Sequence, residues 1–414
     1  MNRAAVQRLT WVLFFGQSLG SAGYIAGSTV ATIVGDKLSG RAALAGVPGF
    51  VYLLGSAAAA FPAARLMEHS GRRLGLALGF ALGVGGALLA GWSVLVESFP
   101  FFLVGMVIMG AANGSTNLAR YGAAEMHPVD ERGRAISLVV LGGTFGAIVG
   151  PSVVGPMGQL AESLHRDALA GPWLASAVLF GVGALLISLF LRPDPRDLGR
   201  TLEAAGPAES AAPAGPLRPV REVLALSGAQ AAIAALVVGQ VVMVMIMAIT
   251  SLHMVHHNHG LGDVSLVIMA HTLGMFGLSL VTGRLVDRLG RGQTIMAGTG
   301  ILILACLLAP LSQNTYLLAL ALFLLGLGWN FCYVAGGAML TDMLTVTERG
   351  RWQGSIDLLI SLVSAAGSLG SGAIFAALGF AWMSWFSLAV TLVPLALALN
   401  FILRRPQPRV AALP

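Results

Sequence analysis

Long apolar stretches alternate with short polar segments along the whole chain. A helix of about 20 apolar residues is long enough to cross the hydrocarbon core of a bilayer. The pattern therefore predicts an all-α membrane protein with twelve transmembrane helices. We place them near residues 9–33, 43–64, 74–96, 99–120, 135–159, 172–191, 223–252, 263–283, 293–312, 315–340, 353–378 and 380–403.

A polar, proline-rich segment divides these stretches into two groups of six. It runs from Arg192 to Arg221 and holds six prolines, a composition typical of an extended linker. We expect residues 1–192 to form an N-terminal six-helix bundle, 193–221 a cytoplasmic linker and 222–414 a C-terminal six-helix bundle.

The composition excludes a soluble protein. Hydrophobic residues make up 56% of the chain and charged residues only 10%, whereas soluble domains carry about 25% charged residues. Cys306 and Cys332 both fall in apolar stretches, so we interpret them as packing residues and not as a disulfide framework. The net charge of +6 does not predict nucleic-acid binding, because the arginines lie at helix ends.

The distribution of basic residues predicts the orientation. If the N-terminus is cytoplasmic, 21 of the 24 lysines and arginines fall in cytoplasmic segments, and the exceptions are Lys37, Arg41 and Arg166. The positive-inside rule therefore places both termini in the cytoplasm.

The two halves of the chain repeat each other. Residues 64–73 correspond to 283–292 at an offset of 219, and the pairs at an offset of 217 are Glu131 with Glu348, Asn113 with Asn330 and Glu125 with Asp342. Parallel repeats of six helices are typical of transporters that expose a central site alternately to each side of the membrane. Asn113 and Asn330 are polar positions inside membrane helices, so they are candidates for lining the central cavity.

Charged residues in the repeated loops are candidates for a conformational latch, and they are Asp287, Arg288, Arg291, Glu68 and Arg72. A carboxylate beside a helix N-terminus can pair with a nearby arginine in one conformation and release it in the other. The alternative is a solvated charge cluster that only orients the loop.

Soft side chains occur at helical spacing in the seventh and eighth stretches. Met243 and Met247 share one helix face, and so do His271 and Met275. Thioether sulfur and imidazole nitrogen suit copper, especially Cu(I). If the helices face each other, Met243 and His271 should share one depth, with Met247 above and Met275 below. Alternatively, the methionines only fill the core and the histidine bonds to a neighbouring helix.

A histidine-rich tract follows at the outer end of the seventh stretch, and its members are His253, His256, His257 and His259. Such a tract can capture a metal ion. Because neutral imidazole is the binding form, capture should weaken below about pH 6. A solvated loop without this role is the alternative.

The fifth stretch carries small residues and a proline at close spacing: Gly146, Gly150, Pro151 and Gly155. Small residues allow close helix packing, and proline bends a helix. The segment is therefore a candidate hinge.

The loop at 283–292 and the twelve-helix plan resemble the major facilitator superfamily. Within it, the Met243/Met247 and His271/Met275 pairs are similar to those of the CcoA-like copper importers, as are the runs 328–331 and 348–354. The resemblance implies twelve helices in two bundles, and copper import across the bacterial cytoplasmic (inner) membrane. It further implies copper supply to the assembly of cbb3-type cytochrome c oxidase. Related members without both motifs carry organic substrates such as riboflavin.

The sequence thus predicts a copper importer and not an enzyme. Copper is its transported substrate, and no prosthetic group is expected. The bilayer surrounds it, a cytoplasmic copper chaperone is the candidate acceptor, and nucleic acid is not a partner. Two alternatives stay open: a riboflavin-like or drug transporter of the same fold, and a copper sensor or assembly partner that does not transport.

Overall fold

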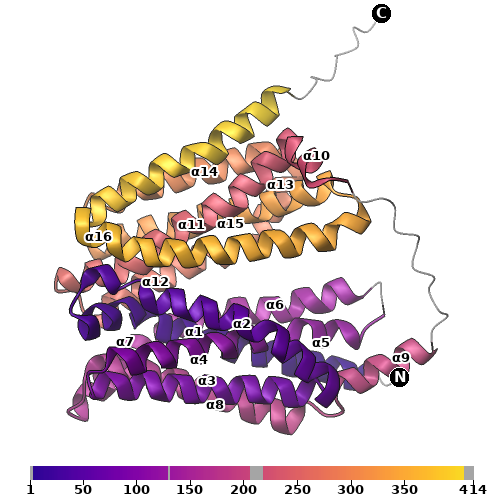
Figure 1. Cartoon of the computed structure of the whole chain (residues 1–414), viewed down its shortest axis with the longest axis horizontal. Coiled ribbons are helices and arrows are strands. Elements are labelled where there is room, and N and C mark those ends of the chain that lie inside the picture. Colours follow the sequence, from indigo (N-terminus) through magenta and orange to yellow (C-terminus); the bar gives the residue numbers. More distant parts are fainter. Residues whose placement is uncertain (1–2, 129–130, 206–217, 405–414) are drawn as a thin grey trace, which may run out of the picture.

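The computed structural model describes residues 3–128, 131–205 and 218–404, and every regular element in these ranges is a helix. Figure 1 shows two layers of helices, one from each half of the chain. The elements are α1 (Arg3–Ser39), η1 (Ala42–Leu44), α2 (Val47–Ser70), α3 (Arg72–Leu95), α4 (Phe99–Thr116), α5 (Ala119–Glu125), α6 (Arg132–Ser152), α7 (Val154–Ser163), η2 (Ala168–Ala170), α8 (Gly171–Phe190), α9 (Pro195–Ala205), α10 (Val220–Ala225), α11 (Ser227–His256), α12 (Leu261–Phe276), α13 (Ser279–Leu289), α14 (Arg291–Leu308), α15 (Thr315–Met343) and α16 (Val346–Arg404).

Each of the twelve predicted stretches coincides with a helix or a helix pair. Among the described residues, nine helices are long and apolar enough to cross a bilayer, and the pair α12 and α13, bent by 44°, makes a tenth. Gly379 interrupts α16 with a φ of 82°, a conformation that glycine adopts without steric cost. The two arms of α16 consequently double back on each other and supply the last two predicted stretches (Figure 1).

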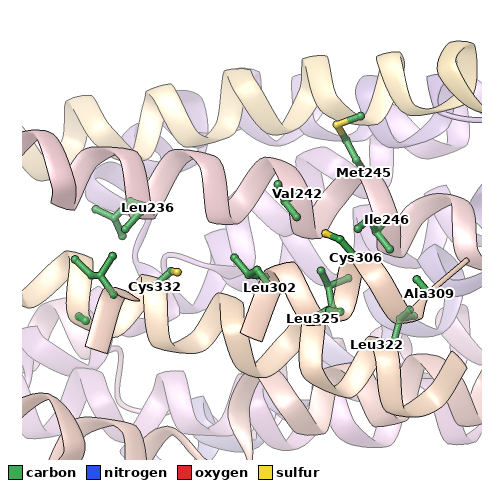
Figure 2. Packing of buried hydrophobic residues seen from close by; sticks show 14 of the residues in the cluster. Leu236, Val242, Met245, Ile246, Leu302, Cys306, Ala309, Leu322, Leu325 and Cys332 are labelled. Carbon is green, nitrogen blue, oxygen red and sulfur yellow. The ribbon is translucent and has the colours of Figure 1, made fainter. Parts of the chain in front are cut away.

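Two clusters of buried hydrophobic side chains form the interior. One is built from residues between Val6 and Leu191. The other is built from residues between Val223 and Phe401, together with Ala45 from the first half. Figure 2 shows part of the second cluster, where Cys306 lies beside Val242 and Ile246 of α11.

Glycines bring helix backbones into contact at the same place in both halves. A Cβ atom at Gly110 would lie 2.0 Å from the Tyr52 carbonyl oxygen, and one at Gly326 would lie 2.2 Å from the His271 carbonyl oxygen. No side chain fits at such distances, so only glycine lets α4 approach α2 and α15 approach α12 this closely.

The predicted hinge also uses close glycine packing. A Cβ atom at Gly146 would lie 1.9 Å from the Ser18 carbonyl oxygen of α1. Soon after Pro151 the helix breaks between α6 and α7. The hydroxyl of Ser265 on α12 donates a hydrogen bond to the Pro151 carbonyl, so this break lies at a contact between the two bundles.

The bundles meet at the end opposite the two chain termini (Figure 1). There, the Thr32 hydroxyl donates to the Ala248 carbonyl at 2.8 Å, and the Ser368 hydroxyl donates to the Gly46 carbonyl at 3.0 Å. The imidazole Nε2 of His256 lies 2.9 Å from a carboxylate oxygen of Asp36. With the Ser265 bond, four hydrogen bonds between the described parts of the bundles lie toward this end.

Both described ends of the linker segment dock on the bundles. Before α9, the Asp194 carboxylate accepts the backbone N–H groups of Arg72 and Arg73 at the start of α3, at 3.0 and 2.9 Å. Before α10, the Arg218 Nε donates to Glu348 at 2.9 Å. Residues 206–217 lie outside the described chain.

Candidate functional site

His271 lies in the interior of the C-terminal bundle, on α12. Its side chain is fully buried, and its Nδ1 lies 3.0 Å from the Leu322 carbonyl oxygen on α15. When Nδ1–H donates this bond, Nε2 carries the free lone pair of a neutral imidazole. Nε2 is buried and has no hydrogen-bond partner among the described residues. Metal-binding histidines are commonly held in this way, with one ring nitrogen on a carbonyl and the other free to coordinate.

The three methionines of the predicted ligand set lie on the expected helices. Met243 and Met247 lie one turn apart on α11, and Met275 lies one turn after His271 on α12. Met243 is buried, whereas Met247 and Met275 are half-buried. Both pairs fall within uninterrupted helices, so each pair shares one helix face as the spacing predicts.

Among the described residues, no three His, Cys, Asp or Glu side chains are placed so that they could together hold a metal ion. The predicted set is of another kind, because it combines one imidazole with three thioethers. Neutral thioether ligands favour Cu(I) and bind it without the charge of a thiolate or a carboxylate.

Met245 and the two cysteines are packing residues, as predicted. Met245 is 4% exposed, and a Cβ atom at Gly367 on α16 would contact its side chain at 3.6 Å. Figure 2 shows Met245 directed toward α16. Cys306 and Cys332 are buried free thiols in the same core.

The two predicted cavity asparagines have different surroundings. Asn330 donates through Nδ2 to the Met275 carbonyl at 2.7 Å and to the Ser279 hydroxyl at 2.9 Å. It thereby joins α12 to α13 across their bend. Asn113 is half-buried, and its Nδ2 lies 3.4 Å from the Ser56 hydroxyl.

The four histidines of the outer tract have separate partners. His253 stacks on Phe380 of α16 at 4.3 Å between ring centroids, and its ring is 4.3 Å from that of His257. His256 bonds Asp36, as described above. The Nδ1 of His259 lies 3.2 Å from the Thr315 hydroxyl. The tract therefore offers one imidazole pair, 253 with 257, and not a four-ligand cluster.

His253 and Phe380 also line a pocket of about 560 Å³ toward the end at which the two bundles meet. The rest of its lining comes from the segment between α14 and α15 and from Ala381. Of the imidazole pair, His253 therefore borders this open space.

Two of the predicted latch residues, Arg72 and Arg291, form ion pairs within their own bundles. In the first half, the Arg72 Nε donates to Glu125 at 2.9 Å. In the second, the Arg291 Nε donates to Asp342 at 2.9 Å. The two pairs occupy equivalent places in the repeat, and each joins the start of one helix to the end of another.

The other latch candidates contribute less. The Asp287 side chain is 77% exposed and lies 3.6 Å from Arg291, and an exposed pair of this kind contributes at most about 1 kcal/mol. Glu68 and Arg288 are exposed. The N–H groups at the start of α3, which we expected Glu68 to approach, are taken by Asp194. Sequence reasoning missed Asp194 because it lies more than 100 residues away.

Glu348, the repeat partner of Glu131, is tied to the end of the linker. Its carboxylate accepts two side-chain hydrogen bonds from Arg218 and the backbone N–H of Thr345. The Arg218 guanidinium, followed by the Thr345 N–H, holds the pKa of Glu348 well below its usual range. Glu131 is exposed.

Tyr24 and Tyr52 form a stacked pair in the N-terminal bundle that sequence reasoning missed. Their rings stack at 4.4 Å between centroids with an interplanar angle of 13°. They precede Met243 and His271 by 219 residues, and Ser28 precedes Met247 by the same number. Applying the repeat offset to the metal motifs would have identified them.

Backbone packing supports that alignment. A Cβ atom at Gly150 would lie 2.8 Å from the Ala22 carbonyl oxygen of α1, and one at Gly367 would lie 3.9 Å from the Val241 carbonyl oxygen of α11. Ala22 and Val241 are 219 residues apart. The stacked tyrosines and the predicted copper ligands therefore occupy equivalent positions in the two bundles.

The Major Facilitator Superfamily model matches residues 11–262 and 231–414. The chain belongs to the major facilitator superfamily. It is 36% identical to the MFS-type transporter YdeG of Bacillus subtilis over 397 residues, which cover 95% of this chain and 92% of that protein. It is 30% identical to the riboflavin transporter RfnT of Brucella anthropi, covering 96% and 98% of the two chains.

A solved structure agrees with the superfamily fold. The crystal structure of a D-xylose–proton symporter superposes with a TM-score of 0.72 at 14% sequence identity, covering 96% of this chain and 97% of that one. The predicted fold class is therefore confirmed, and this major facilitator superfamily protein is a multi-pass membrane transporter.

Proposed function

We propose that this transporter imports copper through Met243, Met247, His271 and Met275. The observation that carries the proposal is the state of His271. Burying an imidazole inside a membrane protein costs free energy, so such a residue is by default a candidate for a functional role. Here one ring nitrogen is held by a carbonyl, and the other is buried with no hydrogen-bond partner in the described part of the chain, which suits a metal ligand.

The internal repeat supports contact between α11 and α12, the two helices that carry the proposed copper ligands. In the N-terminal bundle, the stacked rings of Tyr24 on α1 and Tyr52 on α2 are in direct contact. Their equivalents in the C-terminal bundle are Met243 on α11 and His271 on α12. We therefore expect sulfur and imidazole to face each other at one depth, as a two-ligand site that Met247 and Met275 extend along the path.

Few neutral ligands suit a carrier, because release must follow binding. The four hydrogen bonds between the bundles lie toward the end opposite the termini. If both termini are cytoplasmic, as the basic residues predict, this end is the outer one. In the proposed cycle, this is the state in which the bundles are closed on the outer side and copper is released on the cytoplasmic side.

Capture at the outer end is assigned to the pair His253 and His257, because their rings lie 4.3 Å apart and His253 borders the pocket. The released copper would pass to a cytoplasmic chaperone and supply cytochrome oxidase assembly. The cytoplasmic-membrane location and the oxidase link rest on the resemblance of the two motifs to the CcoA-like importers.

A second candidate is an organic-solute transporter with a riboflavin-like substrate. It is favoured by the 30% identity to RfnT over nearly the whole chain. In that case the methionines pack the cavity wall, and transport does not depend on metal. The third candidate, a copper sensor that does not transport, would bind copper without flux.

The deciding experiment is radioactive copper uptake by cells that lack their own importer. At matched expression we compare the wild type, Met243→Ala/Met247→Ala and His271→Ala, with Met245→Leu as the packing control. Riboflavin uptake is measured on the same cells. Copper uptake that both ligand variants lose and Met245→Leu keeps is the expected result.

Other outcomes separate the candidates. Copper uptake retained by His271→Ala removes His271 from the path. No copper uptake by the wild type, together with riboflavin uptake, selects the organic-solute candidate. Copper binding to purified protein without uptake selects the sensor.

A further inference from the structure

A groove opens between α3, α7 and α8 of the N-terminal bundle and has a volume of about 280 Å³. Figure 1 shows α3 and α8 along the edge of the N-terminal layer that is turned away from the C-terminal layer. Because the other bundle lies on the opposite side, the groove faces lipid when the protein is in a bilayer.

The lining of the groove is almost wholly apolar. Leu88, Trp92 and Leu95 of α3 line it together with Leu160 of α7 and Leu174 of α8. Each of these five side chains is between 44% and 50% exposed. Large apolar side chains exposed around a concave surface mark a contact with lipid or with an apolar ligand.

The groove spans most of one membrane leaflet. Its lining on α3 runs from Ala87 to Leu95, the last residue of that helix. This length of helix measures roughly 12 Å, and one leaflet of the hydrocarbon core is about 15 Å thick. With both termini cytoplasmic, α3 ends on the outer side, so the groove lies in the outer leaflet. Its length therefore suits an acyl chain of that leaflet.

A basic side chain, Arg166, lines the groove just beyond the end of α7. His165 adopts a left-handed φ of 56°. The Arg166 N–H donates to the Ala161 carbonyl and the His165 N–H to the Glu162 carbonyl, both at 2.9 Å. These two bonds form a Schellman motif, in which the residue after the left-handed one commonly packs an apolar side chain on the last helical turn. Here that residue is an arginine whose backbone is fixed by the cap.

The Arg166 guanidinium forms no ion pair or hydrogen bond within the described chain. The adjacent Asp167 is paired with Lys37 and accepts the Leu169 N–H at 2.9 Å. An arginine in this position can lay its methylene stem on the apolar wall and keep its charge at the membrane surface. A free guanidinium there is complementary to a phosphate group.

We propose that the groove binds one phospholipid of the outer leaflet, with an acyl chain along α3 and the phosphate on Arg166. The apolar lining accounts for the chain, and the guanidinium without a protein partner accounts for the headgroup. This inference goes beyond the proposed copper import and does not depend on it, because the groove lies on the lipid-facing side of the bundle.

Native mass spectrometry of the purified full-length protein tests the inference. The probes are dioleoyl phosphatidylglycerol and dioleoylglycerol, which carry the same acyl chains and differ in the phosphate-containing headgroup. Arg166→Gln removes the proposed phosphate ligand, and Arg41→Gln, at another basic residue predicted on the outer side, is its control.

A second pair of variants tests the apolar wall. Leu174→Trp fills the groove, and Leu185→Trp is its control, because Leu185 is exposed on the same helix but does not line the groove. All four substitutions are at exposed positions, so the unfolding midpoints without added lipid should match that of the wild type.

We expect the wild type to bind phosphatidylglycerol at least fivefold more tightly than dioleoylglycerol. Arg166→Gln should weaken phosphatidylglycerol binding by about fivefold, the effect of one arginine beside an anionic lipid, and should leave dioleoylglycerol binding unchanged. Leu174→Trp should weaken binding of both lipids. Arg41→Gln and Leu185→Trp should match the wild type.

Three results overturn the inference. Equal affinity of the wild type for the two lipids would show that the phosphate is not recognised. Equal phosphatidylglycerol affinity of Arg166→Gln and Arg41→Gln would remove Arg166 from the site. Equal lipid binding by Leu174→Trp and Leu185→Trp would make the groove an ordinary part of the lipid boundary.

Discussion

The two bundles share a backbone plan but differ in the chemistry of their inner faces. Where helices touch backbone to backbone, the repeat is kept: Gly110 meets the Tyr52 carbonyl, and Gly326 meets the His271 carbonyl. The side chains of those same two partner residues have diverged into a phenol and an imidazole. Helix packing constrains the glycines, whereas the partner side chains can differ between the bundles.

A second difference lies at the end of the linker. Glu348 is clamped by Arg218, while its repeat partner Glu131 is exposed. Arg218 lies just before α10, in the linker that leads into the second bundle. The asymmetry therefore arises where the linker meets the second bundle.

The largest effect should come from filling the two equivalent glycine contacts. Gly110→Val and Gly326→Val each place atoms against a backbone carbonyl, so helices must separate. We expect destabilisation of about 3 kcal/mol or more and little folded protein in the membrane, measured by fluorescence-detected size exclusion. Gly337→Val, where nothing lies within 4 Å, is the control. Normal yields of both variants would mean that the repeat does not extend to helix packing.

Met243 and Met245 lie on the same helix but have different assigned roles, since Met243 is a proposed copper ligand and Met245 packs in the core. Met243→Leu keeps the volume but removes the sulfur, so we expect copper uptake to fall at least tenfold. Met245→Leu should leave uptake unchanged and alter stability by less than about 1.5 kcal/mol. Equal uptake by the two variants would assign Met243 to the core.

The repeated ion pairs should differ in strength. The side chains of Arg72 and Glu125 are 12% and 32% exposed, against 30% and 51% for Arg291 and Asp342. Arg72→Ala should therefore destabilise by about 1 to 2 kcal/mol and Arg291→Ala by less than about 1 kcal/mol, read from thermal unfolding. The reverse order would mean that the second pair does more than join two helices.

The smallest effect concerns Glu348. Because Arg218 lowers its folded-state pKa, this group stabilises the protein above the pKa of the unfolded chain, and the contribution is lost as pH falls. The unfolding midpoint of the wild type should exceed that of Glu348→Gln by a few degrees near pH 7. This difference between the two unfolding midpoints should shrink below about pH 4.5. Glu131→Gln, at the exposed repeat partner, is the matched control.

Much of the fold could be predicted from the sequence because its signals are local or repeated. Apolar length predicted the twelve helical stretches, and the repeat matched Arg72 with Arg291 and Glu125 with Asp342, which the structure joins in equivalent ion pairs. The helical spacing of Met243, Met247, His271 and Met275 placed each pair on one face. These inferences need only chain geometry and the cost of polar groups in a bilayer.

Other features depend on contacts between distant segments, which no local pattern encodes. The docking of Asp194 on α3, the free Nε2 of His271, the bond between His256 and Asp36, and the stacking of Tyr24 on Tyr52 each require helices to be placed in space. The sequence by itself therefore determined the membrane-spanning plan, the repeat and the candidate ligands. The tertiary structure alone decided which polar atoms are paired and which stay free, because hydrogen bonding depends on distances between side chains that tertiary packing sets.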